Sequence, residues 1–101
     1  MSKKYASKVD VNQPTIVKWF RDHGCSVAHT HNAGLGFPDL VVGINGLNLL
    51  VEVKDGDKPP SARKLTKDQE KWHGEWSGQV AIVKDVNECR ELLEQFNVYL
   101  I

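Results

Sequence analysis

Residues 39–54, DLVVGINGLNLLVEVK, decide the fold of this chain. Two apolar runs flank Asn45-Gly46, the dipeptide that most strongly predicts a β-hairpin, because both central residues of a type I′ turn need a positive φ angle. The first run, residues 39–44, is almost wholly apolar after its first residue, which is typical of a strand buried on both faces. Residues 47–54 form the expected return strand, so the centre of the domain is predicted to be an antiparallel pair.

The register of this hairpin brings two acidic residues together. A two-residue turn pairs Ile44 with Leu47, and counting outward along both strands places Asp39 directly opposite Glu52. Directly opposed side chains have Cβ atoms roughly 4.5–5.5 Å apart. At an effective dielectric of about 20, two such charges repel each other by on the order of 4 kcal/mol. A divalent cation held between the carboxylates would offset this repulsion, and a loop of another length would still leave the two acids neighbours.

A lysine and a backbone carbonyl complete the candidate site. Lys54 lies two residues from Glu52 and therefore on the same face of the strand. The Val53 side chain points the other way, but its carbonyl oxygen lies at the same level. Mg²⁺ and Mn²⁺ prefer carboxylates, carbonyl oxygens and water, so we expect Asp39, Glu52 and Val53 to bind one of these ions. An ammonium group beside a metal orients water and neutralises charge on a phosphate, which favours phosphodiester hydrolysis. No Ser or Cys lies near a His at this level, which argues against acyl transfer.

A purely structural interpretation of the same residues is the alternative. Asp39 would then cap a strand end, and Glu52 would be a solvated edge residue paired with Lys54. The opposition of the two acids within an otherwise apolar hairpin favours the metal site, because an uncompensated pair of like charges destabilises a sheet.

Hydrophobic periodicity and the placement of Gly, Pro and cap residues predict five further elements. They are a helix over residues 12–23, a strand over 25–30, a helix over 67–76, a strand over 79–83 and a last helix over 88–96. Asn12, Thr66 and Asn87 are the expected N-caps of the three helices. The order α-β-β-β-α-β-α predicts an α/β fold with a mixed sheet flanked by helices. The crossover through the second helix is expected to be right-handed and to return a parallel strand.

Two glutamines lie on the inward faces of these helices. Gln13 shares the apolar face of the first helix, where it is either a satisfied buried amide or a functional group. Gln69 either closes a capping box with Thr66 or contributes to the site from the face that it shares with Trp72. Trp72 and Trp76 are expected in the core. In the loop over residues 31–37, which precedes the first strand of the hairpin, Gly34 and Gly36 allow either close approach to DNA or an ordinary flexible turn.

Composition limits the class of protein. The chain has 101 residues, which suits one domain over residues 10–101 after a flexible basic tail over residues 1–9. Basic and acidic residues number 13 each, so bulk charge alone does not attract nucleic acid. The basic residues nevertheless cluster around the loop after residue 54, whereas the segment from residue 85 is net acidic. Those expected to contact DNA are Lys58, Arg63, Lys64 and Lys67.

Three further features bear on location and metal chemistry. No apolar run approaches the length of a membrane span, and residues 1–5 lack the apolar segment of a secretory signal. Cys25 and Cys89 match no zinc or disulfide pattern, so we expect reduced thiols in a cytoplasmic protein. His29 and His31 lie two residues apart without further zinc ligands nearby, so exposure or contact with DNA is expected instead.

The motif Phe37-Pro38-Asp39, followed by Glu52-Val53-Lys54 and an inward Gln69 on the next helix, resembles the PD-(D/E)XK nuclease superfamily. Two stretches, NAGLGFPDL over residues 32–40 and LTKDQ over residues 65–69, are more narrowly similar to the VRR-NUC family in its short stand-alone phage and bacterial form. The likeness covers roughly residues 10–94. It implies a restriction-endonuclease-like αβββαβ core with an added C-terminal helix, in the cytoplasm of a bacterial or phage-infected cell.

The resemblance also implies roles for individual residues. Asp39, Glu52 and the Val53 carbonyl bind Mg²⁺ or Mn²⁺, Lys54 is catalytic, and Gln69 supports Lys54 or the attacking water. Many superfamily members carry a glutamate on the first helix near the metal. This chain has Gln13 there, which we count as a candidate catalytic residue, and Asp10 one turn earlier. Which of the two approaches the metal is open.

The leading hypothesis is a metal-dependent, structure-selective DNA endonuclease. The resemblance to short stand-alone members implies a homodimer that resolves Holliday junctions, since cutting both strands of a four-way junction needs two active sites. The alternative is a module with a nuclease fold that binds branched DNA without cutting it. A third hypothesis is a structural or interaction protein whose acidic pair is exposed.

Overall fold

The computed structural model describes residues 9–99. The expected basic tail, apart from Val9, and the last two residues of the chain lie outside this range. Val98 is buried against the core and Tyr99 is exposed, and neither belongs to a strand.

Every helix and strand expected from the sequence is present, in the expected order. The helices are α1 (Gln13–Asp22), α2 (Lys67–Glu75) and α3 (Val86–Gln95), and the strands are β1 (Ser26–His29), β2 (Leu40–Ile44), β3 (Leu47–Val53) and β4 (Ala81–Val83). Two short 3-10 helices, η2 (His31–Ala33) and η3 (Pro60–Ala62), lie in the loops. None of the described helices is long and apolar enough to cross a membrane.

The four strands form one mixed sheet in the order β1-β2-β3-β4. The first three strands are antiparallel neighbours, and β4 runs parallel to β3 after the crossover through α2. Ile44 lies opposite Leu47, as expected for a two-residue turn. Asn45 and Gly46 adopt φ angles of 52° and 79°, which confirms the predicted positive-φ turn.

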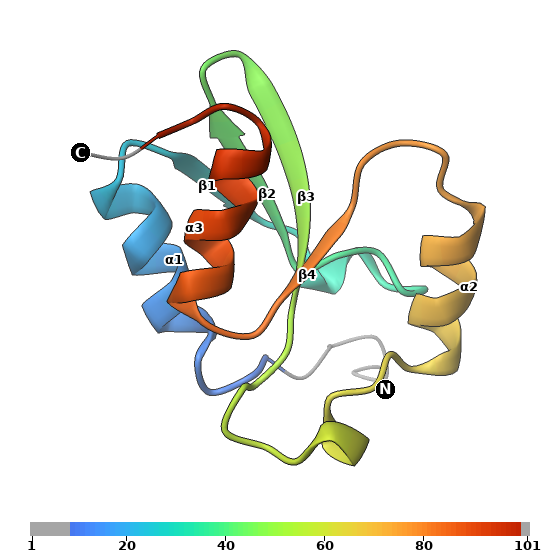
Figure 1. Ribbon diagram of the computed structural model, residues 1–101. Coiled ribbons are helices and arrows are strands. Elements are labelled where there is room, and N and C mark those ends of the chain that lie inside the picture. Colours follow the sequence, from blue (N-terminus) through green and yellow to red (C-terminus); the bar gives the residue numbers. More distant parts are fainter. Residues whose placement is uncertain (1–8, 100–101) are drawn as a thin grey trace.

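The core lies between the sheet and the pair α1 and α3, which stand together on one side of the sheet in Figure 1. Alternate side chains of β3 face this core, and those between them point to the opposite face. The core residues from helices and strands are Ile16, Val17, Phe20, Leu40, Val42, Leu49, Val51, Val53, Val83, Cys89, Leu92 and Leu93. Glu52 therefore points away from α1 and α3, towards the side on which α2 stands.

The tryptophans of α2 and of its C-terminal end are less buried than expected. None of the residues of α2, all of them described, is fully buried, and Trp76 is 44% exposed. The indole rings of Trp72 and Trp76 stack at 4.7 Å, and Phe37 packs on Trp72 at 5.2 Å between ring centroids. The prediction that both tryptophans lie in the core is wrong, because α2 stands apart from the main core and its aromatic residues pack mainly on one another.

Two of the three predicted N-caps also differ. Helix α3 begins two residues earlier than expected, and Asp85, not Asn87, accepts the capping hydrogen bond from the Glu88 N–H at 2.9 Å. Asn12 precedes α1, but within residues 9–99 its side chain caps no helical N–H. Its amide donates instead to the carbonyl oxygens of Lys54 and Lys84, at 2.9 and 3.0 Å. This side chain therefore ties α1 to the ends of β3 and β4.

Candidate active site

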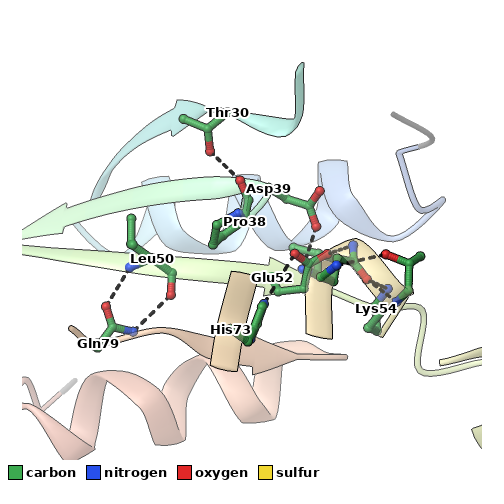
Figure 2. A network of polar contacts seen from close by, with 11 residues as sticks. Thr30, Pro38, Asp39, Leu50, Glu52, Lys54, His73 and Gln79 are labelled. Carbon is green, nitrogen blue, oxygen red and sulfur yellow. Dashed lines mark hydrogen bonds and ion pairs between the residues drawn. The ribbon is translucent and has the colours of Figure 1, made fainter. Parts of the chain in front are cut away.

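Asp39 and Glu52 converge at the start of β2. Asp39 precedes Leu40 and Glu52 follows Val51, and Leu40 and Val51 are the last observed pair of the hairpin, so the register predicted from the turn is confirmed up to the edge of the site. Asp39 is 8% exposed and Glu52 is 1% exposed. One Asp39 carboxylate oxygen accepts the Val53 N–H at 2.8 Å, which places this carboxylate beside the Val53 backbone (Figure 2). The description of Glu52 as a solvated edge residue is therefore wrong, whereas Asp39 does satisfy a strand-end N–H.

The protonation of Glu52 reflects its surroundings. Burial, followed by a side-chain hydrogen bond and the charge of Asp39, raises the pKa of Glu52 to about 9, while the positive charge of Lys54 opposes this rise. The metal-free site thus retains a proton at neutral pH. At neutral pH, a cation close to both carboxylates would be needed for both to be ionised, since the desolvated negative charges repel each other.

This raised pKa predicts how the stability of the metal-free protein depends on pH. The folded state binds the Glu52 proton more tightly than the unfolded state, in which the pKa is near 4.5. The stabilisation is therefore complete below about pH 4.5 and is lost as the pH rises towards about 9. The expected loss is on the order of a few kcal/mol over this window. Urea unfolding in a chelator, at a series of pH values, measures it.

The comparison with Glu52→Gln isolates this contribution from other titrating groups. A neutral amide has no proton to lose, so the difference in unfolding free energy between the two proteins should change steadily with pH over the same window. A difference that does not vary with pH would contradict the assignment.

Gln69 links Lys54 to Glu52. The Lys54 ammonium donates to the Gln69 side-chain oxygen at 2.8 Å, and the Gln69 amide donates to Glu52 Oε2 at 2.9 Å. The same Gln69 oxygen accepts the Thr66 N–H at 2.9 Å, completing the capping box of α2. The capping-box interpretation of Gln69 is therefore confirmed, and the same side chain also joins Lys54 to the buried Glu52.

Gly36 holds α2 at this position. Its φ angle is +85°, and a Cβ atom there would lie 2.2 Å from the Asp68 carbonyl oxygen and 2.8 Å from the Gln69 nitrogen. The loop before β2 thus packs backbone to backbone against the first turn of α2. The conformational freedom of Gly36 serves this contact within the protein.

We expect Gly36→Ala to destabilise the protein by about 2–4 kcal/mol, from the positive φ and the backbone clash together. Displacement of the first turn of α2 should also separate Gln69 from Lys54 and Glu52. Gly34→Ala is the matched control, since Gly34 has φ +79° but no described atom lies within 4 Å of its Cβ position. Urea unfolding of both variants checks this, and equal losses would contradict the proposed contact.

Gln13 and Asp10, the two candidates for the first-helix position near the metal, differ in their surroundings. Gln13 is 2% exposed, and among residues 9–99 its side-chain oxygen has no hydrogen-bond partner. It lines a groove of about 530 Å³ together with residues of α1 and β1, including Arg21 and His29. The charge of Asp10, in contrast, contributes to the raised pKa of Glu52. Asp10 therefore acts on Glu52 through its charge, whereas Gln13 is an uncharged amide buried at the start of α1.

The four basic residues expected to contact DNA lie in the loop after β3 and at the start of α2. The Lys58 ammonium lies 3.5 Å from an Asp10 carboxylate oxygen, and Arg63 donates to the Gly56 carbonyl at 3.2 Å. Lys64 and Lys67 are exposed. Two of the four thus have intramolecular partners that a bound phosphate would have to share.

His73 was missed by sequence reasoning. It lies one helical turn after Gln69, and Nε2 of its imidazole is 3.9 Å from Glu52 Oε1 (Figure 2). Burial, and then the charge of Lys54, lowers the pKa of His73. The four-residue spacing from Gln69 was the available signal, because residues at i and i+4 share a helix face.

The donor atoms at this site fit a hard divalent ion. Within residues 9–99, no three His, Cys, Asp or Glu side chains gather in a geometry that could hold a metal ion. The candidate protein ligands are accordingly two carboxylates and the Val53 carbonyl, with water completing the coordination. Mg²⁺ and Mn²⁺ accept such a set, since Mg²⁺ in particular retains several waters. Glu52 Oε1 has no hydrogen-bond partner among the described residues, so its lone pairs are available to an ion.

Comparison of the chain with protein-family models, with curated proteins and with solved structures found no match. The functional interpretation therefore depends on the sequence motifs and on the geometry of this site.

Proposed function

We propose that this protein is a divalent-metal-dependent endodeoxyribonuclease that hydrolyses phosphodiester bonds. The observation that carries the proposal is the buried pair Asp39 and Glu52, with Lys54 joined to Glu52 through Gln69. Two carboxylates buried side by side need a compensating cation to be ionised together at neutral pH, and carboxylates beside a lysine suit reaction at a phosphate.

Each of these residues has a distinct part in the proposed reaction. Asp39, Glu52 and the Val53 carbonyl hold Mg²⁺ or Mn²⁺, which when bound polarises the phosphate and lowers the pKa of water. The Lys54 ammonium neutralises charge that builds on the phosphate oxygens and orients the attacking water. Gln69 holds Lys54 at a set distance from Glu52, so that the lysine is in position before the substrate binds.

The fold is part of the same proposal. The order αβββαβ and the mixed four-stranded sheet agree with a restriction-endonuclease-like core, and the motifs resemble the VRR-NUC family. We take Asp10 to be the acidic residue nearest the metal outside the hairpin, since Gln13 replaces the glutamate that many superfamily members carry. Fewer acidic ligands are expected to weaken metal affinity without removing activity.

The proposed substrate is branched DNA, in particular a four-way junction cut by a homodimer. Lys64, just before α2, and Lys67, its first residue, are exposed and are proposed to contact backbone phosphates. One small domain carries one such site, so symmetrical cleavage of two strands needs two copies. DNA and a second copy of the chain are therefore the proposed partners.

The test is nicking of a synthetic four-way junction by the purified protein with Mn²⁺ or Mg²⁺. We expect cleavage that a chelator abolishes and that is slower on linear duplex. Asp39→Asn, purified in parallel, controls for contaminating nucleases and should be inactive. Absence of nicking of any DNA structure with either metal would contradict the proposal.

The replacement of the first-helix glutamate by Gln13 favours a second candidate, a module that binds branched DNA without cutting it. In that case the purified protein would bind the junction equally well with metal or with chelator, and no product would form.

A further inference from the structure

We infer that His73 is a positioning residue that, together with Gln69, clamps the two oxygens of the Glu52 carboxylate for metal binding. The inference rests on the proposed metal site and adds a residue that neither the sequence motifs nor the family resemblance assigned.

Gln69 and His73 lie one helical turn apart on α2. Both lie on one face of α2, and each faces a different oxygen of the same carboxylate: the Gln69 amide donates to Oε2 at 2.9 Å, and His73 Nε2 faces Oε1 at 3.9 Å. Two side chains one turn apart can reach both oxygens of one carboxylate, because the i and i+4 positions are neighbours on a helix surface.

The two facing atoms, Glu52 Oε1 and His73 Nε2, share the lack of another partner in the described part of the chain. Both Glu52 Oε1 and His73 Nε2 are buried, and neither has a hydrogen-bond partner among residues 9–99. Buried polar atoms without partners destabilise a fold. Because these two atoms face each other, we expect them to form a hydrogen bond. At 3.9 Å the pair is longer than a hydrogen bond, but a small rotation of the imidazole or the carboxylate would close it.

The role that follows is to orient Glu52. With a proton on Nε2, His73 donates to Glu52 Oε1 while Gln69 donates to Oε2, and both oxygens keep lone pairs for the ion. Hydrogen-bonded partners of this kind fix the direction of a ligating carboxylate, and their removal typically weakens metal affinity by about 10- to 100-fold.

The experiment measures Mn²⁺ affinity by calorimetry in the full-length chain, for the wild type and three variants. His73→Ala should bind Mn²⁺ about 10- to 100-fold more weakly. His73→Gln should recover most of this loss, because its amide nitrogen is as many bonds from Cα as Nε2 of histidine and also donates. Glu75→Ala, at an exposed position on the same helix, is the control and should match the wild type.

Nitrogen NMR of the imidazole ring in the Mg²⁺-loaded protein supplies a second readout, which a purely structural role would not move. We expect Nε2 of His73 to carry a proton. Unchanged Mn²⁺ affinity in His73→Ala, or an unprotonated Nε2 in the Mg²⁺-loaded wild type, would overturn the inference and leave the proposed nuclease site standing. A wild-type protein that binds no Mn²⁺ would instead overturn the proposed function, and the inference with it.

Discussion

Replacing Glu52 with glutamine is expected to reduce junction cleavage by at least about 1,000-fold, because the site loses the negative charge that holds the cation. Glu52 is the more deeply buried of the two acids, and its side chain contacts Gln69. The amide preserves the shape of the side chain, so the fold should be retained. Single-turnover cleavage with Mn²⁺ measures the loss.

Thermal melting separates this effect from misfolding. Mn²⁺ should raise the melting temperature of the wild type, since a ligand that binds only the folded state stabilises it, and should leave Glu52→Gln unchanged. Glu75→Gln, on the exposed side of α2, should behave as the wild type in both assays. Cleavage by Glu52→Gln at the wild-type rate would contradict the site.

Replacing Lys54 with methionine is expected to slow cleavage by about 100- to 1,000-fold while leaving metal binding largely intact. The ammonium is held 2.8 Å from the Gln69 oxygen, and its charge lowers the pKa of Glu52. Methionine keeps most of the length of the side chain but cannot neutralise a phosphate or orient water. The rate should fall in single-turnover assays, and calorimetry should still detect Mn²⁺.

Lys71→Met is the matched control for this variant. Lys71 is exposed on the same helix as Gln69, so its loss should reduce DNA affinity at most and leave the saturated cleavage rate unchanged. If the Lys54 and Lys71 variants slowed cleavage equally, the role of Lys54 would be general charge attraction and not chemistry.

The hairpin accounts for what the sequence predicted well. Asn45-Gly46 specifies a two-residue turn, and such a turn determines which residues face each other along both strands. The proximity of Asp39 and Glu52 follows from local geometry alone. The capping box was also readable, since Thr66 and Gln69 interact within one helical turn.

The position of α2 on the sheet, and the contacts of its side chains with other elements, could not be predicted from local geometry. A long loop connects it to β3, and no periodic pattern indicates where on the sheet such a helix settles. Its tryptophans were expected in the core, and His73 was overlooked. The apolar face of α1 predicted that Gln13 turns inwards, and Gln13 is buried, but amphipathic spacing does not show which group an inward side chain meets.

The amino-acid sequence alone thus determined the order of the elements, the register of the central hairpin and the meeting of its two acids, because each depends on short-range backbone geometry. Only the tertiary structure decided that Gln69 joins Lys54 to Glu52, that Gly36 seats α2 against the loop, and that His73 faces the buried carboxylate. Those contacts connect residues 15 to 33 positions apart in the sequence. They depend on how a helix that follows a long loop packs against the rest of the protein, which no local sequence pattern encodes.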